Sequence, residues 1–203
     1  MTEIRSLVRA DADEVDAVRR IYLDSFPERQ RERFDDLIGA IRAGDVDGWV
    51  QVDGETPVGM AIALRFASVD WYFLEYFAVD GSVRGKGYGT ALLASLVEQA
   101  GVRRMIFEVE DPNDTTDPDE MAIRRRRIVF YQRLGARLID GVDYVVPDVT
   151  GTGTEPLRLM WFDADGQNLD RATLETLVRA LYVEGYGLPP SHTLLAAAVK
   201  SLE

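Results

Sequence analysis

The sequence predicts a mixed α/β domain of the α+β type, with a mostly antiparallel central sheet flanked by helices. Runs with the two-residue alternation of strands lie between runs with the spacing of amphipathic helices. Three strand-like runs follow one another between residues 48 and 79, which favours an antiparallel meander. A glycine-rich turn then joins the third of these strands to an apolar helical stripe. The last 40 residues are expected to form a helical extension.

The first half of the chain alternates between the two patterns. Apolar residues recur at helical spacing after a short N-terminal strand, and the Asp53-Gly54 pair predicts a hairpin turn. The expected strands are 4–9, 48–52, 58–66 and 71–79, and the expected helices are 11–26 and 31–43.

The second half continues with strands and longer helices. Asp117 is expected to cap a helix with Pro118 in its first position, and the Glu120 carboxylate to reach back to the cap amide. The glycine-rich turn should lead into a helix that ends at Gly101. The other expected strands are 105–109, 143–146 and 157–162, and the other helices are 117–134, 169–183 and 191–202.

Composition limits the classes of function. The chain has 203 residues, of which 46% are hydrophobic and 29% charged, as in ordinary globular proteins. A net charge of −12 argues against a nucleic-acid partner and favours a cationic or amine-bearing one. With no cysteine and one histidine, His192, we expect neither a metal site nor a thiol nucleophile. The lack of a long apolar run predicts a cytoplasmic protein without membrane contact.

The glycine-rich turn is the most informative local motif. Arg84-Gly85-Lys86-Gly87-Tyr88-Gly89 stands where a strand passes into a helix. Successive backbone N–H groups in such a turn can point at one anion, and the helix dipole favours negative charge there. The spacing does not fit the dinucleotide fingerprint or the G-K-[ST] phosphate loop. A phosphate or pyrophosphate would fit such a turn, and a purely structural turn is the alternative.

Two motifs together give the sequence a resemblance to the GNAT superfamily of N-acetyltransferases. Arg84, Gly87 and Gly89 fit that family's coenzyme pattern Q/R-x-x-G-x-G/A, between a hydrophobic strand and an apolar helix. The segment 130–137 resembles the family's F-Y-x-x-x-G-F motif, with Ala136 in place of the usual aromatic. The resemblance covers about residues 3–163. It implies an acetyltransferase domain over residues 1–163, with residues 164–203 as an extension packed on or beside it.

The resemblance implies acetyl-coenzyme A as the acetyl donor and places its contacts. The pyrophosphate is expected on the amides between Arg84 and Thr90, and the pantetheine arm along Phe77 and Val79. The family often has a coenzyme-contacting asparagine at the position of Arg124, seven residues before Tyr131, so Arg124 is an expected contact; a solvated helix face is the alternative. The expected coenzyme-binding residues are Phe77, Val79, Arg84, Gly85, Lys86, Gly87, Tyr88, Gly89, Thr90 and Arg124.

The same resemblance implies catalytic roles. Tyr131 is the expected general acid, better described as a hydrogen-bond donor to the leaving thiolate, because phenol is a weaker acid than thiol. Strand alternation predicts that Glu75 lies on one face with Phe77 and Val79. Glu75 and Glu108 lie within apolar strand runs, where a carboxylate is costly unless it is paired or functional, and either one is a candidate base. The alternatives are a core tyrosine and carboxylates that pair with arginine or face solvent.

The acceptor pocket is the least determined part. By resemblance, the first two helices and the last hairpin line it, and packing or surface roles are the alternatives. The expected residues are Phe26, Glu28, Arg29, Trp71, Tyr72 and Trp161.

These observations predict direct acetyl transfer to a primary amine of a small molecule or peptide. The alternative is a non-catalytic acyl-coenzyme A-binding regulatory module, and a further one is an anion-binding domain without coenzyme. A homodimer is compatible with the sequence, which does not fix the oligomeric state.

Overall fold

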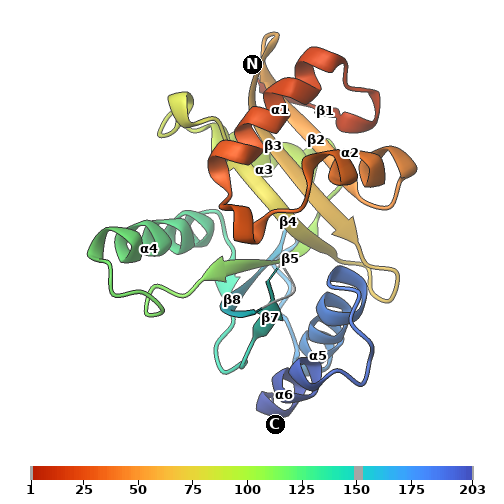
Figure 1. Ribbon diagram of the computed structural model, residues 1–203, viewed down its shortest axis with the longest axis vertical. Helices are drawn as coiled ribbons and strands as arrows, with labels where there is room; N and C mark the ends of the chain where they lie inside the picture. Colours follow the sequence, from red (N-terminus) through yellow and green to blue (C-terminus); the bar gives the residue numbers. More distant parts are fainter. Residues whose placement is uncertain (1, 149–152, 203) are drawn as a thin grey trace. The chain divides into compact units, whose positions relative to one another are not determined.

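The computed structural model describes residues 2–148 and 153–202 (Figure 1). The chain divides into two compact units. The first comprises the residues up to Arg65 together with Leu74–Val102, and the second comprises Phe66–Phe73 together with the residues from Arg103 onward.

The first unit is a sheet of antiparallel strands with helices on both faces. β1 pairs antiparallel with β2, and β2 with β3, through a turn in which Gly54 has φ +63°. The polar pair Asp53-Gly54 thus forms the predicted hairpin. Its elements are β1 (Thr2–Ser6), η1 (Leu7–Arg9), α1 (Ala12–Ser25), η2 (Glu28–Gln30), α2 (Phe34–Ala43), β2 (Asp47–Asp53), β3 (Thr56–Arg65), the later part of β4 (Tyr72–Val79), η3 (Gly81–Val83) and α3 (Tyr88–Glu98).

Residue alternation in the strands separates two packing layers. One layer lies between the sheet and helices α1 and α2, which Figure 1 shows in front of β1–β3. It takes alternate strand residues, Val50 and Val52 of β2 and Tyr76 and Ala78 of β4. α3 packs on the opposite face with Leu92, Leu93 and Leu96 buried. Because both faces are covered, β3 is buried at every residue from Val58 to Ala63.

The second unit is built on a long antiparallel pair. β5 pairs antiparallel with β8 along its whole length, and it pairs in parallel with the start of β4 at Tyr72 and Phe73. β6 and β7 also pair with β8, in the antiparallel sense. The elements are β5 (Arg104–Glu110), α4 (Pro118–Arg133), β6 (Arg137–Leu138), β7 (Val145–Pro147), β8 (Thr154–Asp163), α5 (Arg171–Ala180), the π-helical turn η4 (Leu181–Gly185) and α6 (Thr193–Ser201).

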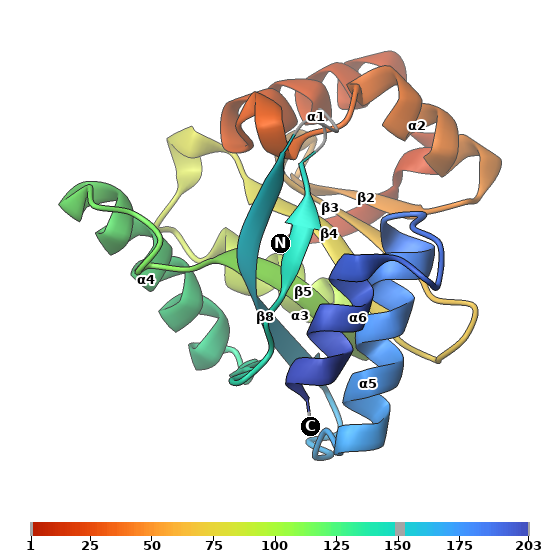
Figure 2. The same cartoon turned by 60° about the horizontal axis from the view of Figure 1, so that its bottom comes forward.

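Helices cover the strands of the second unit. α4 packs against β5 and β6, and α6 packs against β7 and α5. Figure 2 shows α5 and α6 side by side. Within the described residues, no helix has both the length and the apolar character needed to cross a bilayer.

The predicted fold class is confirmed, and several local predictions need correction. The first strand ends at Ser6, because the Ser6 side chain caps a 3-10 turn where strand was expected as far as Arg9. The second helix begins at Phe34 rather than Arg31, whose guanidinium instead donates to the carbonyl oxygens of Leu23 and Phe26. The two-residue strand β6 was not predicted.

The predicted cap of α4 is half right. Asp117 accepts from the amide of Asp119, as an N-cap residue should. Glu120 does not return to the cap amide, since Thr115 Oγ1 accepts from the Asp117 amide at 3.2 Å. The Glu120 carboxylate instead pairs with Arg124 and accepts from the Thr115 hydroxyl. The division into residues 1–163 and 164–203 stays a prediction.

Candidate active site

The predicted site residues fall into two groups, one in each unit. In the first unit, β4 presents alternate residues on the face away from the α1–α2 core. Glu75, Phe77 and Val79 are half-buried there, whereas Tyr76 and Ala78 between them are buried in that core. The alternation expected for this strand is therefore present, with its carboxylate on the same face as the two predicted coenzyme contacts.

The glycine-rich turn connects β4 to α3 through an exposed loop. Gly85 and Gly87 have φ +80° and +87°, a left-handed conformation that favours glycine, and Gly87 is the N-cap of α3. The first intrahelical bond runs from the Ala91 amide to the Gly87 carbonyl. The amides of Tyr88, Gly89 and Thr90 therefore precede the helical ladder, as the donors of an anion site must.

Side chains from three elements hold this loop. Arg84 Nε donates to the carbonyl of Val79 at 3.3 Å, and Arg84 Nη2 donates to Ser25 Oγ. Gln51 Nε2 of β2 donates to the Tyr88 carbonyl at 3.2 Å, and the Tyr88 hydroxyl donates to Asp53 Oδ2 at 2.6 Å. The loop is thus fixed at its beginning by Arg84 and at its end by Tyr88.

Gln51 and Asp53 are residues that the sequence analysis missed. Gln51 is fully buried, and Oε1 of its side chain has no hydrogen-bond partner among the described residues. Gly59 lies opposite it, where a Cβ would come within 2.8 Å of that oxygen, so a larger residue there would require the Gln51 side chain to shift. A polar residue within the apolar run Val50-Gln51-Val52 was the available signal.

In the second unit, Tyr131 lies on the inner face of α4. Its ring centroid is 4.5 Å from that of Phe107 on β5, and the residue is only 8% exposed. Burial raises the pKa of Tyr131 to about 12, although the charge of Arg127 opposes this. Full proton transfer from this phenol to a thiolate of ordinary pKa is then uphill by about 5 kcal/mol, so hydrogen-bond donation is its suitable role.

Glu108 lies on β5 and accepts two phenolic hydrogen bonds. The Tyr144 hydroxyl donates to Oε1, and the Tyr186 hydroxyl lies 2.8 Å from both carboxylate oxygens. Burial raises the pKa of Glu108 to about 7, while the two tyrosine hydrogen bonds oppose that rise. A carboxyl group with this pKa is suited to accept a proton near neutral pH. No sequence signal pointed to Tyr144 or Tyr186, because both contacts span long stretches of the chain.

Arg124 is buried, at 6% exposed, and so does not lie on the solvated helix face that was the alternative. Its Nη1 donates to the Asp111 carbonyl, and its Nη2 pairs with Glu120 at 2.6 Å and Glu110 at 3.6 Å. Its Nε is buried without a partner in the described part of the chain. These contacts give Arg124 a role in holding the segment before α4, and its contact with coenzyme stays a prediction.

The predicted acceptor residues differ in their surroundings. In the first unit, Phe26 packs on Tyr22 and Tyr76, while Glu28 and Arg29 are exposed on η2. In the second, Tyr72 is half-buried at the start of β4.

Two predicted acceptor residues of the second unit are tryptophans that pack on each other. Trp71 and Trp161 are 5% and 7% exposed, with ring centroids 6.3 Å apart, and Arg137 lies over the Trp161 ring. Both rings thus take part in packing, and their contact with the acceptor stays a prediction.

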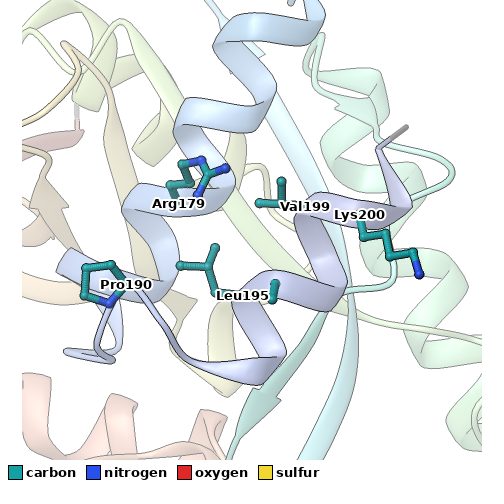
Figure 3. A pocket seen from close by; sticks show the side chains of 6 residues that line it. Arg179, Pro190, Leu195, Val199 and Lys200 are labelled. Atoms are coloured by element: carbon teal, nitrogen blue, oxygen red, sulfur yellow. The ribbon is translucent and has the colours of Figure 1, made fainter.

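The C-terminal helices also carry an open hollow of about 430 Å³ (Figure 3). Arg179 of α5 and Leu195, Ala196, Val199 and Lys200 of α6 line it, with Pro190 at one end. None of the predicted site residues lines this hollow. In the described ranges, no group of three or more His, Asp or Glu side chains is arranged to hold a metal ion.

Comparison with known proteins decides the family. The model of the acetyltransferase (GNAT) family matches residues 15–135, more than half of the chain. The chain belongs to this family. It is accordingly an acyltransferase, and both motifs that suggested the resemblance lie within or at the edge of the matched range.

Solved structures agree with the family assignment. A protein from Bacteroides thetaiotaomicron ascribed to the GNAT acetyltransferases is 26% identical, with a TM-score of 0.76, over 92% of this chain and 99% of that one. An aminoglycoside 6'-N-acetyltransferase complexed with coenzyme A has 19% identity and a TM-score of 0.60, over 82% and 99% of the two chains. A Bacillus subtilis acetyltransferase in complex with coenzyme A has 14% identity and a TM-score of 0.53, over 80% and 99%. The last two show a shared fold. No match was found among curated protein sequences.

Proposed function

We propose that this acetyltransferase moves an acetyl group from acetyl-coenzyme A directly to a primary amine of a small molecule or peptide, within a ternary complex. The observation that carries the proposal is the exposed loop from Arg84 to Thr90. Its left-handed glycines and the first amides of α3 form a cradle suited to a pyrophosphate. The presence of coenzyme A in two structures of the same fold supports this choice of ligand.

The loop residues fit the coenzyme by chemistry and by space. A Cβ added at Gly85 or Gly87 would meet nothing within 4 Å, so no other part of the chain fills the space beside these two glycines. Lys86 adds a positive charge in the same exposed loop. We assign the pyrophosphate to this loop, and the pantetheine arm to the β4 face that bears Phe77 and Val79.

Bound acetyl-coenzyme A supplies the thioester carbonyl that the amine attacks. The chain's own residues do the rest: Glu108 or Glu75 accepts the proton of the amine, the Val79 amide donates to the carbonyl oxygen, and Tyr131 donates to the departing sulfur. We favour Glu108 as the base because its pKa near 7 makes it a better proton acceptor than an ordinary glutamate. The absence of cysteine agrees with direct attack by the amine.

The acceptor class follows from charge. The net charge of −12 favours a cationic amine over an anionic one.

We propose residues 1–163 as the catalytic domain and residues 164–203 as the extension to it. The proposed acceptor contacts are Phe26, Glu28, Arg29, Trp71, Tyr72 and Trp161.

The test has two stages. Acetyl-coenzyme A at about 100 times its Kd should stabilise the protein by about 2.7 kcal/mol, which is roughly 5 to 10 °C in Tm. Inorganic pyrophosphate at the same concentration is the control, and an equal shift with pyrophosphate would indicate only an anion-binding turn. A panel of cationic amines is then screened by thiol release, to which a cysteine-free protein adds no background. Tight coenzyme binding without turnover on any amine would favour the regulatory module instead.

A further inference from the structure

The C-terminal part of the second unit contains an irregular turn next to Glu108. α5 ends at Ala180, and the chain continues as the π-helical turn η4, closed by a bond from the Tyr186 amide to the Leu181 carbonyl at 2.9 Å. π-helical turns are rare and occur frequently at functional sites. Tyr186 is the residue that caps the end of this turn.

Polar contacts fix the turn on two sides. The Glu184 carboxylate accepts from the amides of Ala67 and Ser68 and from the Ser68 hydroxyl. The Tyr182 hydroxyl donates to the Val145 carbonyl at 2.8 Å. The turn is therefore tied both to the segment before β4 and to β7.

The backbone at Gly185 also passes close to Phe73. A Cβ at Gly185 would lie 3.2 Å from the Phe73 ring, closer than an ordinary contact, so an added side chain would require the ring or the turn to shift. The Tyr186 ring lies 6.3 Å from the same Phe73 ring. From this position the Tyr186 hydroxyl reaches the Glu108 carboxylate, at 2.8 Å from both oxygens.

We propose that the C-terminal extension completes the acceptor side of the reaction, with Tyr186 as the positioning residue that orients Glu108 and keeps it ionised. This rests on the proposed function, because it takes Glu108 as the base. The Tyr186 hydroxyl has one proton, so it serves one carboxylate oxygen at a time. Tyr144 donates to Oε1, which leaves Oε2 able to accept a proton from the acceptor amine.

The surroundings of Glu108 determine the direction of the expected effect. Tyr144 and Tyr186 donate to the carboxylate and lower its pKa, while the negative charge of Glu155 on β8 raises it. On α4, Arg127 is paired with Glu110 at 2.8 Å and Arg124 with Glu120, so neither is engaged with Glu108. Removing the Tyr186 hydroxyl takes away a donor that favours the charged form, and the pKa of Glu108 should rise.

The test compares Tyr186→Phe with Tyr182→Phe. The control removes a hydroxyl from the same turn that bonds to the Val145 backbone rather than to Glu108. The Glu108 pKa is measured by carboxyl-carbon NMR titration of the free enzyme, and the acid limb of the kcat/KM profile by thiol release. In Tyr186→Phe we expect both to move up by about one pH unit, with a lower kcat at pH 6.5. In Tyr182→Phe, which keeps both phenolic donors to Glu108, we expect both to move clearly less than in Tyr186→Phe.

Two outcomes would overturn the inference. If neither quantity moves in Tyr186→Phe, the hydroxyl does not act on Glu108. If the NMR titration moves and the acid limb does not, Glu108 is not the group on which the reaction depends. A wild-type enzyme with no turnover on any amine would instead remove the proposed function, and the NMR titration would still decide whether Tyr186 controls the ionisation of Glu108.

Discussion

The left-handed N-cap of α3 can be tested with a single methyl group. Gly87 has φ +87° and ψ −1°, and its carbonyl accepts the first helical bond of α3. Alanine in this conformation costs about 1 to 2 kcal/mol. The loss of glycine's freedom in the unfolded chain offsets this by about 0.4 to 1 kcal/mol. Gly87→Ala should therefore destabilise the protein by about 1 kcal/mol, or roughly 2 to 4 °C in Tm.

Gly87→Ala should also weaken coenzyme binding, and this effect should exceed its effect on the stability of the free protein. An alanine that relaxes out of the left-handed region reorients the amides of Tyr88 and Gly89, on which the proposed pyrophosphate site depends. We expect Gly87→Ala to lose most of the Tm rise that acetyl-coenzyme A gives the wild type. Gly81→Ala is the matched control, because Gly81 lies in the same connection with no positive φ and open space around its Cα.

The assay is thermal unfolding of wild type and both variants, with and without acetyl-coenzyme A. The control should keep both its stability and its coenzyme-induced shift. A Gly87→Ala protein that is destabilised yet keeps the full shift would show that the left-handed cap does not form the coenzyme site. An equal loss in both variants would show that the connection tolerates no methyl group at all.

Three further predictions follow from the second unit. Tyr131→Phe should lower kcat about tenfold or more with little change in coenzyme affinity, and an unchanged kcat at saturating substrate would contradict the role given to its hydroxyl. Because the folded pKa of Glu108, about 7, lies above that of an unfolded glutamate, its contribution to the unfolding free energy should fall as pH rises from about 4.5 to 7. Glu108→Gln should remove that fall, which amounts to about 2 kcal/mol between urea titrations at pH 5 and pH 7. Arg124→Met leaves Glu120 and the Asp111 carbonyl without the guanidinium that pairs with them, so the free energy of unfolding should fall by about 2 to 4 kcal/mol while coenzyme affinity is retained. A selective loss of coenzyme affinity that Arg124→Lys restores would instead support the predicted coenzyme contact.

The sequence was informative wherever local rules act. The Asp53-Gly54 turn, the Asp117 cap and the glycine-rich turn between strand and helix each depend on neighbouring residues, and each was predicted. Strand alternation also placed Glu75 on the same face of β4 as Phe77 and Val79.

Prediction failed where a side chain had a partner that the local motif did not indicate. Glu120 suits a capping box, but Arg124 one turn later is a charged partner and takes its carboxylate. Tyr186 is 78 residues from Glu108, and no spacing rule connects them. Gln51 stands out in the sequence as a polar residue in an apolar strand. Its role could not be predicted, because it depends on the Tyr88 carbonyl, which only the fold brings next to it.

The contacts of Tyr88 also bear on how a ligand would arrive. Its carbonyl and its hydroxyl are both held by β2, and Arg84 holds the other end of the loop. The conformational entropy of these residues is therefore lost when the chain folds and not when a ligand binds. Association should then be limited by diffusion and steering rather than by loop closure, and its rate should fall with ionic strength if Lys86 attracts the incoming phosphates.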